Sequence, residues 1–346
     1  MTVPTGRLSP ASPPAPPPRD ARRRRGTFRY VTAAVFTLVV AVPTVPDLLF
    51  GLDRRSPFVQ LVSIRPWILC GVAALLVMLL VVLIFERRVW PFVAGVLAVL
   101  LIGGGMVLPR TLPDTDPVHG SPFRVLAFNT YEGEADANAL AALIEAEQPD
   151  AVALSESGPG FARKLGPLVE PLGYRVHVST DDDGDDDVEE VTAVLSEQLG
   201  DVEVRIGDET SAFPYIEVKG GELDTLRFVV FHSVAPVPGS VPGWNDDLAL
   251  LSRWCAGAAP AVVAGDFNAT LDHSALRAGT TGCEDAAAQR GAGLIPTWGP
   301  SPRVRSFGPQ IDHVFATDGI TAETFDVRDI DGSDHRAVMT TLRLPN

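Results

Sequence analysis

A carboxylate and an amide two positions apart make the most suggestive short motif of the chain. Asp266 and Asn268 follow Gly265 and the apolar run 260–264, which is typical of a short buried strand. Residues i and i+2 of an extended chain point the same way, so both side chains can face one small site. A carboxylate that takes a proton and an amide that holds a water or phosphate oxygen suit the hydrolysis of phosphoesters. Alone, Gly-Asp-x-Asn is also an ordinary turn after a strand.

Polar residues also end other predicted strands, and each one interrupts an apolar run. They are Asn129, Glu156, His232, Asp312, Asp334 and His335. Singly, Asn129 could cap a turn, Glu156 could be a surface carboxylate and His232 a satisfied core histidine. Together the set contains hard oxygen ligands for Mg²⁺ and histidines for proton transfer or charge stabilisation. A carboxylate beside a histidine fixes its tautomer and favours its protonated form.

The elements that must position these side chains alternate between strands and helices. Asp136 is the predicted N-cap of an amphipathic helix at 137–147, and a second helix is predicted at 244–255. Many strands with a few helices between them indicate an α/β sandwich of two sheets over residues 123–346. The predicted strands are 123–129, 151–155, 174–179, 192–196, 202–206, 213–218, 226–231, 260–264, 311–316 and 337–344.

The first third of the chain predicts a membrane region. Apolar stretches at 30–50, 67–85 and 90–108 each approach the ~20 residues that cross a bilayer. Three transmembrane helices are therefore expected over 30–108, after a disordered, proline- and arginine-rich cytoplasmic tail at 1–29. Residues 109–122 predict a linker that lifts the next domain off the membrane. A secretory or twin-arginine signal is the alternative for the first stretch, but that stretch is long and has no clear cleavage site.

The basic residues predict how the spans are oriented. Arginines 22–25 before the first span, and Arg87 and Arg88 between the second and third, favour a cytoplasmic N-terminus. Arg54, Arg55 and Arg65 in the first connection oppose this orientation. The expectation is a multi-pass plasma-membrane protein with residues 123–346 outside the cytoplasm.

The charge balance constrains the partners of the chain. Net charge is −15, and many arginines lie near the N-terminus, so the C-terminal region is more acidic than the total indicates. An acidic domain repels polyanions, which argues against broad nucleic-acid binding. The acidic run 181–187 lacks the ligand spacing of an EF-hand and predicts a solvated loop.

The three cysteines are too few for a disulfide scaffold. Cys255 and Cys283 lie in the predicted external domain, where either a disulfide or two free thiols is open. Cys70 lies in the second predicted span and is expected to be a packing residue.

Five ordered motifs cover the region from 123 to 344. They are Leu126-Ala127-Phe128-Asn129, Leu154-Ser155-Glu156, Gly265-Asp266-Phe267-Asn268, Ile311-Asp312-His313 and Ser333-Asp334-His335. Together they resemble the endonuclease/exonuclease/phosphatase superfamily, which includes DNase I-like nucleases, sphingomyelinases and inositol-phosphate phosphatases. The resemblance implies a DNase I-like four-layer α/β sandwich with its site at the sheet edges.

The same resemblance implies a role for each site residue. Mg²⁺ or Mn²⁺ would bind Glu156, with Asn129 and Asp334 near the metal. Asp266 would orient or activate the attacking water, and Asn268 would hold the phosphate. His335, oriented by Asp312, would be the second catalytic group. His232 would stabilise the phosphoryl transition state.

Two departures from the superfamily pattern bear on the substrate. Thr192 and Glu197 stand where glycine and arginine are usual, and the helix from Trp244 lacks an arginine found in many relatives. Their loss weakens the case for a DNA substrate. The three spans resemble the membrane-anchored branch of the superfamily, which includes the teicoplanin-resistance membrane protein VanJ. That resemblance implies phosphate or diphosphate groups of cell-envelope lipids as substrate.

The leading hypothesis is thus a membrane-anchored, metal-dependent phosphoesterase that acts outside the cytoplasm. The expected partners are a phosphorylated substrate, lipid-linked in the envelope version of the hypothesis, and the bilayer, with nucleic acid disfavoured. The alternatives are an extracytoplasmic nuclease and a non-catalytic envelope protein that uses the fold as a binding module.

Overall fold

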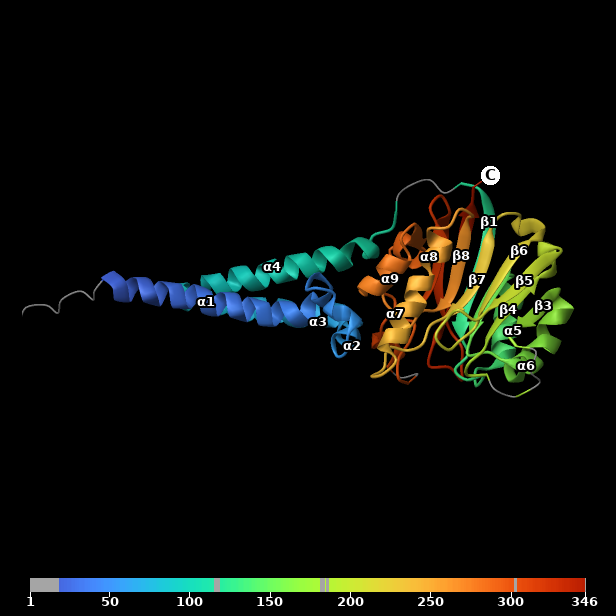
Figure 1. The fold of residues 1–346 in the computed structure, drawn as a ribbon, viewed down its shortest axis with the longest axis horizontal. Helices are drawn as coiled ribbons and strands as arrows, with labels where there is room; N and C mark the ends of the chain where they lie inside the picture. The colour runs from blue at the N-terminus through green and yellow to red at the C-terminus, as the bar shows by residue number, and fades with distance from the viewer. Residues whose placement is uncertain (1–18, 115–118, 181–183, 185–186, 302–303, 346) are drawn as a thin grey trace, which may run out of the picture.

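Three long helices lead into a sandwich of two β-sheets (Figure 1). The computed structural model describes residues 19–114, 119–180, 184, 187–301 and 304–345. The long helices run side by side at one end of the molecule, and both sheets lie at the other end.

The helical part consists of α1 (Arg19–Thr44), α3 (Arg65–Phe85) and α4 (Trp90–Val107). All three contain a stretch long and apolar enough to cross a membrane, as the sequence predicts. The first helix ends at Thr44, short of the predicted residue 50, because Val45 precedes Pro46 and leaves the helical conformation. At its other end, α1 extends back to Arg19, inside the segment predicted as a tail; residues 1–18 lie outside the described part.

Short helices connect the long ones. The first connection contains η1 (Pro46–Leu48), η2 (Leu52–Arg54) and α2 (Phe58–Val62). It lies at the end of the long helices that is next to the sandwich (Figure 1). The second connection is the tight turn η3 (Arg87–Val89) at the far end. After α4, η4 (Leu108–Thr111) leads toward the first strand.

Each sheet has six strands. The first sheet, in spatial order, is β11 (Thr321–Asp329), β12 (Arg336–Leu344), β1 (Ser121–Asn129), β2 (Ala151–Ser155), β4 (Val191–Ser196) and β3 (Tyr174–Val178). The second is β5 (Val202–Gly207), β6 (Tyr215–Gly220), β7 (Arg227–His232), β8 (Ala261–Asp266), β10 (Asp312–Thr317) and β9 (Cys283–Asp285). The pairs β1–β2 and β7–β8 are parallel, and the other pairs are antiparallel.

Alternating side chains on the central strands build the layers. On β1, Val125 and Ala127 face the second sheet, whereas Leu126 and Phe128 face helices on the outer side. Helices α5 (Ala137–Glu147) and α6 (Pro159–Val169) cover the first sheet. The second sheet is covered by α7 (Val241–Leu250), α8 (Ser252–Cys255) and α9 (Ser274–Gly279). The predicted four-layer α/β sandwich is confirmed.

Most predicted elements of the sandwich are found within two residues, and Asp136 caps α5 through the backbone amides of Asn138 and Ala139. The single helix predicted at 244–255 is instead divided into α7 and α8, with α7 starting at Val241. The strands β9 and β11 and the helices α9 and α10 (Ala286–Gln289) were not predicted, because they are short or lack a clear apolar period. Helix α6 was also not predicted; it is amphipathic but contains Pro167, a residue that usually ends a helix.

Buried ion pairs join the helical part to the sandwich. Arg65 donates from Nη1 to Oδ1 of Asp272 at 2.9 Å and also pairs with Asp47. Asp272 pairs with Arg110 as well, and Asp47 accepts from Arg277 at 2.7 Å. We call these five residues the junction cluster. It explains why Arg65 departs from the expected charge pattern, since carboxylates neutralise it.

The segment predicted as a linker also contacts the sandwich. Arg110 is 8% exposed, and the backbone amide of Asp114 donates to the carbonyl of Gln289 at 2.8 Å. Residues 108–114 therefore pack against the domain, whereas residues 115–118 lie outside the described part.

The structure also answers the questions that the cysteines left open. Cys255 and Cys283 form a disulfide between α8 and β9. Cys70 is exposed on the surface of α3, so its prediction as a packing residue is wrong.

Within the acidic run 181–187, Asp187 is buried and accepts hydrogen bonds from the amides of Gly158 and Phe161 at the start of α6. This corrects the solvated-loop prediction for that residue. Residues 181–183 and 185–186 lie outside the described residues.

Candidate active site

All predicted site residues lie at one edge of the sandwich. The strands β1, β2, β7 and β8 end there, whereas β10 and β12 begin there. In register, Asp266 lies opposite His232 on one side and Asp312 on the other. Gly265 permits this arrangement, because a Cβ at its φ of +143° would lie 2.0 Å from the carbonyl oxygen of Phe231.

Asn129 holds two carboxylates together across the two sheets. Its Nδ2 donates to Oε1 of Glu156 at 2.9 Å and to Oδ2 of Asp266 at 3.0 Å. Its Oδ1 accepts from the amide of Tyr131 at 2.9 Å, which fixes the orientation of the side chain. In this orientation Asn129 positions the carboxylates through its nitrogen. Its oxygen is engaged elsewhere.

The backbone is strained at this edge. Glu156 and Asn268 have φ values of 50° and 46°, in the left-handed region that non-glycine residues rarely adopt. The second oxygen of Glu156 accepts from the amide of Glu132 at 2.9 Å. Asn268 is held by its amide, which donates to Oδ1 of Asp266 at 2.8 Å, and by its Nδ2, which donates to the carbonyl of Ser233 at 2.9 Å.

Asp312 and His335 form a buried pair. His335 donates from Nδ1 to Oδ2 of Asp312 at 2.9 Å, which leaves Nε2 at 3.8 Å from Oδ2 of Asp266 and 4.0 Å from Oδ1 of Asp334. Burial opposes the charged imidazole, but the surrounding carboxylates outweigh it and raise the pKa of His335 to about 9. An imidazolium therefore faces Asp266 at neutral pH.

Burial has the opposite effect on the acids. Removal from water, with a contribution from Asp312, raises the pKa of Asp266 to about 7, although His335 and hydrogen bonds to the carboxylate oppose the change. Burial likewise raises the pKa of Glu156. Asp266 is thus poised between its protonated and ionised forms near neutral pH, as a group that accepts a proton requires.

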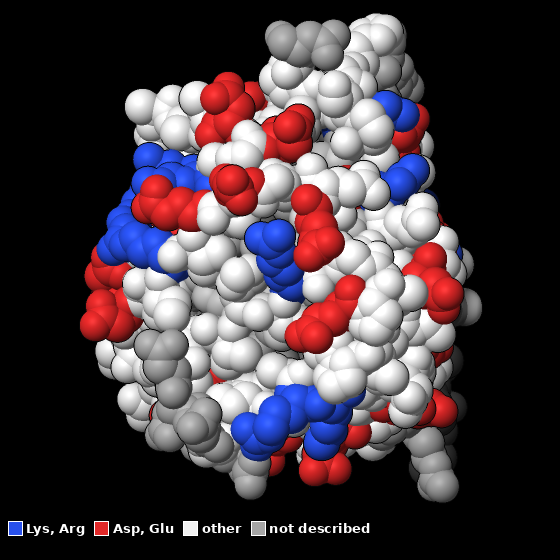
Figure 2. All heavy atoms as spheres, turned by 90° about the vertical axis from the view of Figure 1, so that its right-hand side faces the viewer, with Lys and Arg blue, Asp and Glu red and all other residues white. Residues whose placement is uncertain are grey.

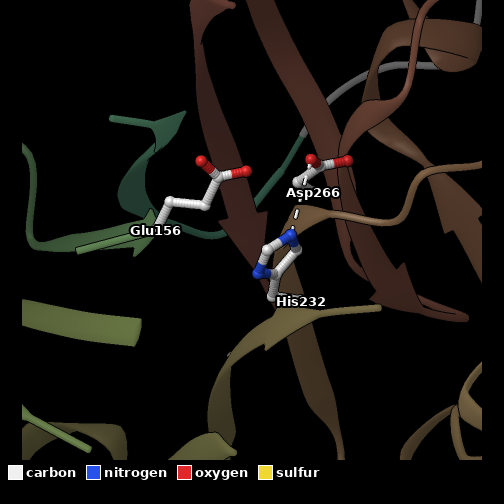
Figure 3. Close-up of side chains that lie close together, drawn as sticks. All are labelled: Glu156, His232 and Asp266. Atoms are coloured by element: carbon white, nitrogen blue, oxygen red, sulfur yellow. Dashed lines mark ion pairs between the residues drawn. The ribbon is translucent and has the colours of Figure 1, made fainter. Parts of the chain in front are cut away.

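His232 lies next to Asp266 but stays neutral. Burial and the positive charge of His335 lower the pKa of His232 to about 3. Its Nε2 lies 3.7 Å from Oδ2 of Asp266, too far for a hydrogen bond (Figure 3). Its ring stacks on Phe213 with centroids 4.2 Å apart. Its Nδ1 is buried without a partner among the described residues.

The donor set fits a hard divalent cation. Donor atoms of Glu156, His232 and Asp266 lie within 4.8 Å of one another (Figure 3), as do those of Asp266, Asp312 and His335. Oδ1 of Asp334 is also buried without a hydrogen-bond partner in the described part of the chain. Carboxylate oxygens that are buried and short of partners are suited to a cation that prefers oxygen ligands.

Supporting residues that the sequence analysis did not assign hold the site in place. Ser333 donates from Oγ to the carbonyl of Asn129 and accepts from the amide of His335, both at 2.9 Å. Trp298 donates to Oδ2 of Asp334 at 2.9 Å. The motif Ser333-Asp334-His335 already contains the serine, whereas Trp298 and Phe213 come from distant loops and carry no signal in the sequence.

Of the departures from the family pattern, Glu197 lies away from the reacting groups, whereas Thr192 and Trp244 support site residues. Thr192 donates from Oγ1 to the carbonyl of Ser157, next to Glu156, at 2.6 Å. Because β4 runs antiparallel to β2, Glu197 lies at the opposite edge of the sheet, where it pairs with Arg175 at 3.3 Å. An arginine at position 197 would not reach the site, so its absence carries no information about the substrate. Trp244 supports Asn268, because its Nε1 donates to the carbonyl of that residue at 3.1 Å.

Comparisons with known proteins agree with this geometry. The sequence profile of the Endonuclease/Exonuclease/phosphatase family matches residues 126–335. The chain belongs to this family. Family members are hydrolases that act on phosphoester bonds, generally with a metal ion. None of the curated proteins matches the chain.

Solved structures show the same fold at low sequence identity. Humanized TDP2 of D. rerio is 18% identical with a TM-score of 0.51, covering 64% of this chain and 99% of that one. An endonuclease/exonuclease/phosphatase from Bacteroides vulgatus is 17% identical with a TM-score of 0.50, covering 65% and 100%. A functionally unknown conserved protein from Enterococcus faecalis V583 is 13% identical with a TM-score of 0.50, covering 64% and 100%.

Proposed function

We propose that this protein is a membrane-anchored, metal-dependent phosphoesterase that hydrolyses phosphate ester or diphosphate bonds outside the cytoplasm. The observation that carries the proposal is the buried arrangement of Asp312, His335 and Asp266. A buried, protonated imidazole that is paired with one carboxylate and faces another is not explained by packing, since buried charges lower stability unless they are fully paired.

Each residue of the edge has a chemical task in such a reaction. A Mg²⁺ or Mn²⁺ ion held by Glu156, with Asn129 and Asp334 beside it, would neutralise charge on the phosphoryl oxygens. Asp266 accepts a proton from the attacking water at Oδ2, and Asn268 orients the phosphate.

The two histidines act on the charge that develops in the transition state. His335 presents a protonated Nε2, which can donate to a phosphoryl or leaving-group oxygen. His232 is neutral, so its Nε2–H can donate a hydrogen bond without adding a second positive charge.

The arrangement of the spans supports an extracytoplasmic domain. Arg87 and Arg88 lie at the end of the helices away from the sandwich, where the positive-inside rule places cytoplasmic residues. Of the opposing arginines, Arg65 pairs with Asp47 and Asp272 and Arg54 is hydrogen-bonded to Ser274, whereas Arg55 is exposed. The position of Arg87 and Arg88 supports a plasma-membrane protein with its site outside the cytoplasm, and cell-envelope lipids are the substrate class that this location favours.

A nuclease is the second candidate, and its support is the family alone. Residues 123–346 carry 37 of the 43 acidic residues but only 15 of the 28 basic ones. On the face turned away from the spans, basic and acidic side chains are interspersed (Figure 2). The acidic excess of the domain repels a polyanion, so we place nucleic acid behind lipid phosphates. A binding module without catalysis is disfavoured by the intact proton-transfer groups.

The test is the release of phosphate or phosphomonoester by the full chain in detergent micelles with Mg²⁺ or Mn²⁺. The substrates are polyprenyl diphosphate and phospholipid on one side, and DNA and RNA on the other. His335→Ala is the inactive variant, and His119→Ala, an exposed histidine outside the site, is its control. Lipid-phosphate cleavage that requires His335 supports the proposal. DNA cleavage alone favours the nuclease, and no cleavage with metal bound favours the binding module.

A further inference from the structure

A cavity of ≈ 230 Å³ lies where the long helices meet the sandwich. The residues that line it are different from those of the catalytic edge. The start of α3 contributes Pro66 and Trp67, η4 contributes Arg110, and Ser63 and loops of the sandwich contribute the rest. The lining residues that matter here are Trp67, Arg110, Leu271, Asp272, Leu294 and Gln310.

The junction cluster borders this cavity through Arg110 and Asp272, and the cluster as a whole carries more positive than negative charge. Asp272 pairs with both Arg65 and Arg110, and Asp47 pairs with both Arg65 and Arg277. Three guanidinium groups thus share two carboxylates, which leaves one positive charge in the cluster. Arg65 is 0% exposed and Arg110 is 8% exposed, so water screens this charge poorly.

Two buried polar atoms around the cavity have no partner among the described residues. They are Nε of Arg110, a donor, and Oε1 of Gln310, an acceptor. Gln310 is held by its Nε2, which donates to the carbonyls of Ala292 and Ile295 at 3.1 Å. A buried donor and a buried acceptor without partners predict that a polar molecule occupies the space between them.

Apolar and aromatic groups cover the remaining wall, at the level where a bilayer would end. Trp67 is 52% exposed at the first turn of α3, and its Nε1 donates to the carbonyl of Phe307 at 3.0 Å. Tryptophan at the end of a membrane span is typical of the headgroup region. A ligand that contacts both the polar groups of Arg110 and Gln310 and the apolar side chains of Leu271 and Leu294 is therefore an amphiphile.

We propose that this cavity binds the headgroup of an anionic membrane phospholipid. Its phosphate accepts from Arg110, a headgroup hydroxyl donates to Gln310, and its chains leave past Trp67 into the bilayer. The proposal rests on the helices crossing a membrane, and it requires no hydrolysis. Such a lipid neutralises the remaining charge of the junction cluster and fixes the sandwich against the spans.

The experiment uses the full chain carrying His335→Ala, kept in EDTA, so that lipid binding is measured without turnover. The protein is placed in nanodiscs of phosphatidylcholine with phosphatidylglycerol as the anionic probe, and retained lipid is counted by native mass spectrometry. We expect at least one phosphatidylglycerol retained in preference to phosphatidylcholine. Inorganic phosphate, added as a competitor, should not displace it, because the phosphate alone lacks the apolar contacts.

A matched pair of variants tests the location. Leu294 is partly exposed, so Leu294→Glu and Leu294→Gln should both fold, and they differ by one negative charge. We expect Leu294→Glu to lower phosphatidylglycerol retention about tenfold relative to Leu294→Gln, a change of ~1.4 kcal/mol. Arg110→Gln should lower retention as well, with folding checked by the thermal unfolding of the same samples.

Three results would overturn the proposal: equal retention of both lipids, equal retention by the two Leu294 variants, or displacement by inorganic phosphate. The first two mean that the cavity holds water only, and the third means that it is a site for free phosphate. Because the measurement is made on an inactive chain, hydrolysis of lipid phosphates by the unmodified protein would stand even if lipid retention failed. If the inactive chain retains phosphatidylglycerol but the unmodified protein hydrolyses no lipid phosphate, the proposed activity is wrong and the lipid-binding site still stands.

Discussion

The molecule contains two buried clusters of charged residues, and they are built in opposite ways. In the junction cluster, each of Asp47 and Asp272 contacts two guanidinium groups. At the catalytic edge, no described lysine or arginine pairs with Glu156, Asp266 or Asp312, and their cationic neighbour is His335.

The difference separates a structural role from a chemical one. Carboxylates that are paired with arginines hold two parts of the chain together. Carboxylates buried without enough positive charge have raised pKa values, as Asp266 and Glu156 do, and they attract a proton or a cation from solution. The predictions below test this separation.

The largest effect is expected at the catalytic edge. Asp266→Asn and His335→Ala each remove a proton-transfer group, so phosphoester hydrolysis by the full chain should fall by roughly 10²–10⁴-fold. Circular dichroism should show unchanged folding. Activity within a few-fold of the unmodified protein in either variant would contradict the assigned roles.

The junction cluster should affect stability instead of catalysis. Asp272→Asn leaves Arg65 and Arg110 facing an uncharged group, which should lower the free energy of unfolding by about 3–5 kcal/mol. Denaturant unfolding in detergent measures this change. Asp246→Asn, at an exposed position of α7, is the control and should change stability by less than ~0.5 kcal/mol. A large loss of activity per folded molecule in Asp272→Asn would contradict a purely structural role for the junction cluster.

The disulfide should stabilise the sandwich without touching either cluster. Its two cysteines are 28 residues apart, and closing a loop of this size stabilises a fold by about 2–4 kcal/mol. The double variant Cys255→Ala, Cys283→Ala should therefore unfold at a lower denaturant concentration with normal activity. Cys70→Ala, the exposed free cysteine, should leave unfolding unchanged.

A cation should stabilise the catalytic edge. At a hundred times its dissociation constant, Mg²⁺ should raise the free energy of unfolding by about 2.7 kcal/mol, and EDTA should remove this gain together with activity. Glu156→Gln should abolish the stabilisation by Mg²⁺. If Mg²⁺ stabilises Glu156→Gln as much as the unmodified chain, the ion binds elsewhere.

The smallest effect concerns pH. The pKa of Asp266 is raised to about 7, so below pH 7 its carboxyl group is protonated, and a cation held by Glu156 no longer has this negative charge beside it. The apparent Mg²⁺ affinity should fall as pH falls, by up to about tenfold per pH unit. Titration calorimetry in buffers of different ionisation enthalpy should detect the released proton. An affinity that is constant between pH 6 and pH 8 would show that Asp266 is ionised throughout.

Local pattern was sufficient for much of this molecule. The apolar runs of the spans and the strict alternation of strands such as β1 are properties of neighbouring residues, so the sequence predicts them directly. Short elements such as β9 were missed because three residues carry no measurable period. The candidate site was predictable because each of its residues interrupts an apolar strand.

What the sequence alone determined is therefore the set of elements, the three candidate spans and the identities of the groups at the catalytic edge. Only the tertiary structure decided that Asn129 bridges two carboxylates through its nitrogen, that Glu197 lies at the wrong edge, and that Arg65 meets Asp272. The physical reason is separation along the chain. The periodicity of a sequence shows which face of an element is apolar. The contact between Arg65 and Asp272, which are 207 positions apart, depends instead on how the helical part packs against the sandwich.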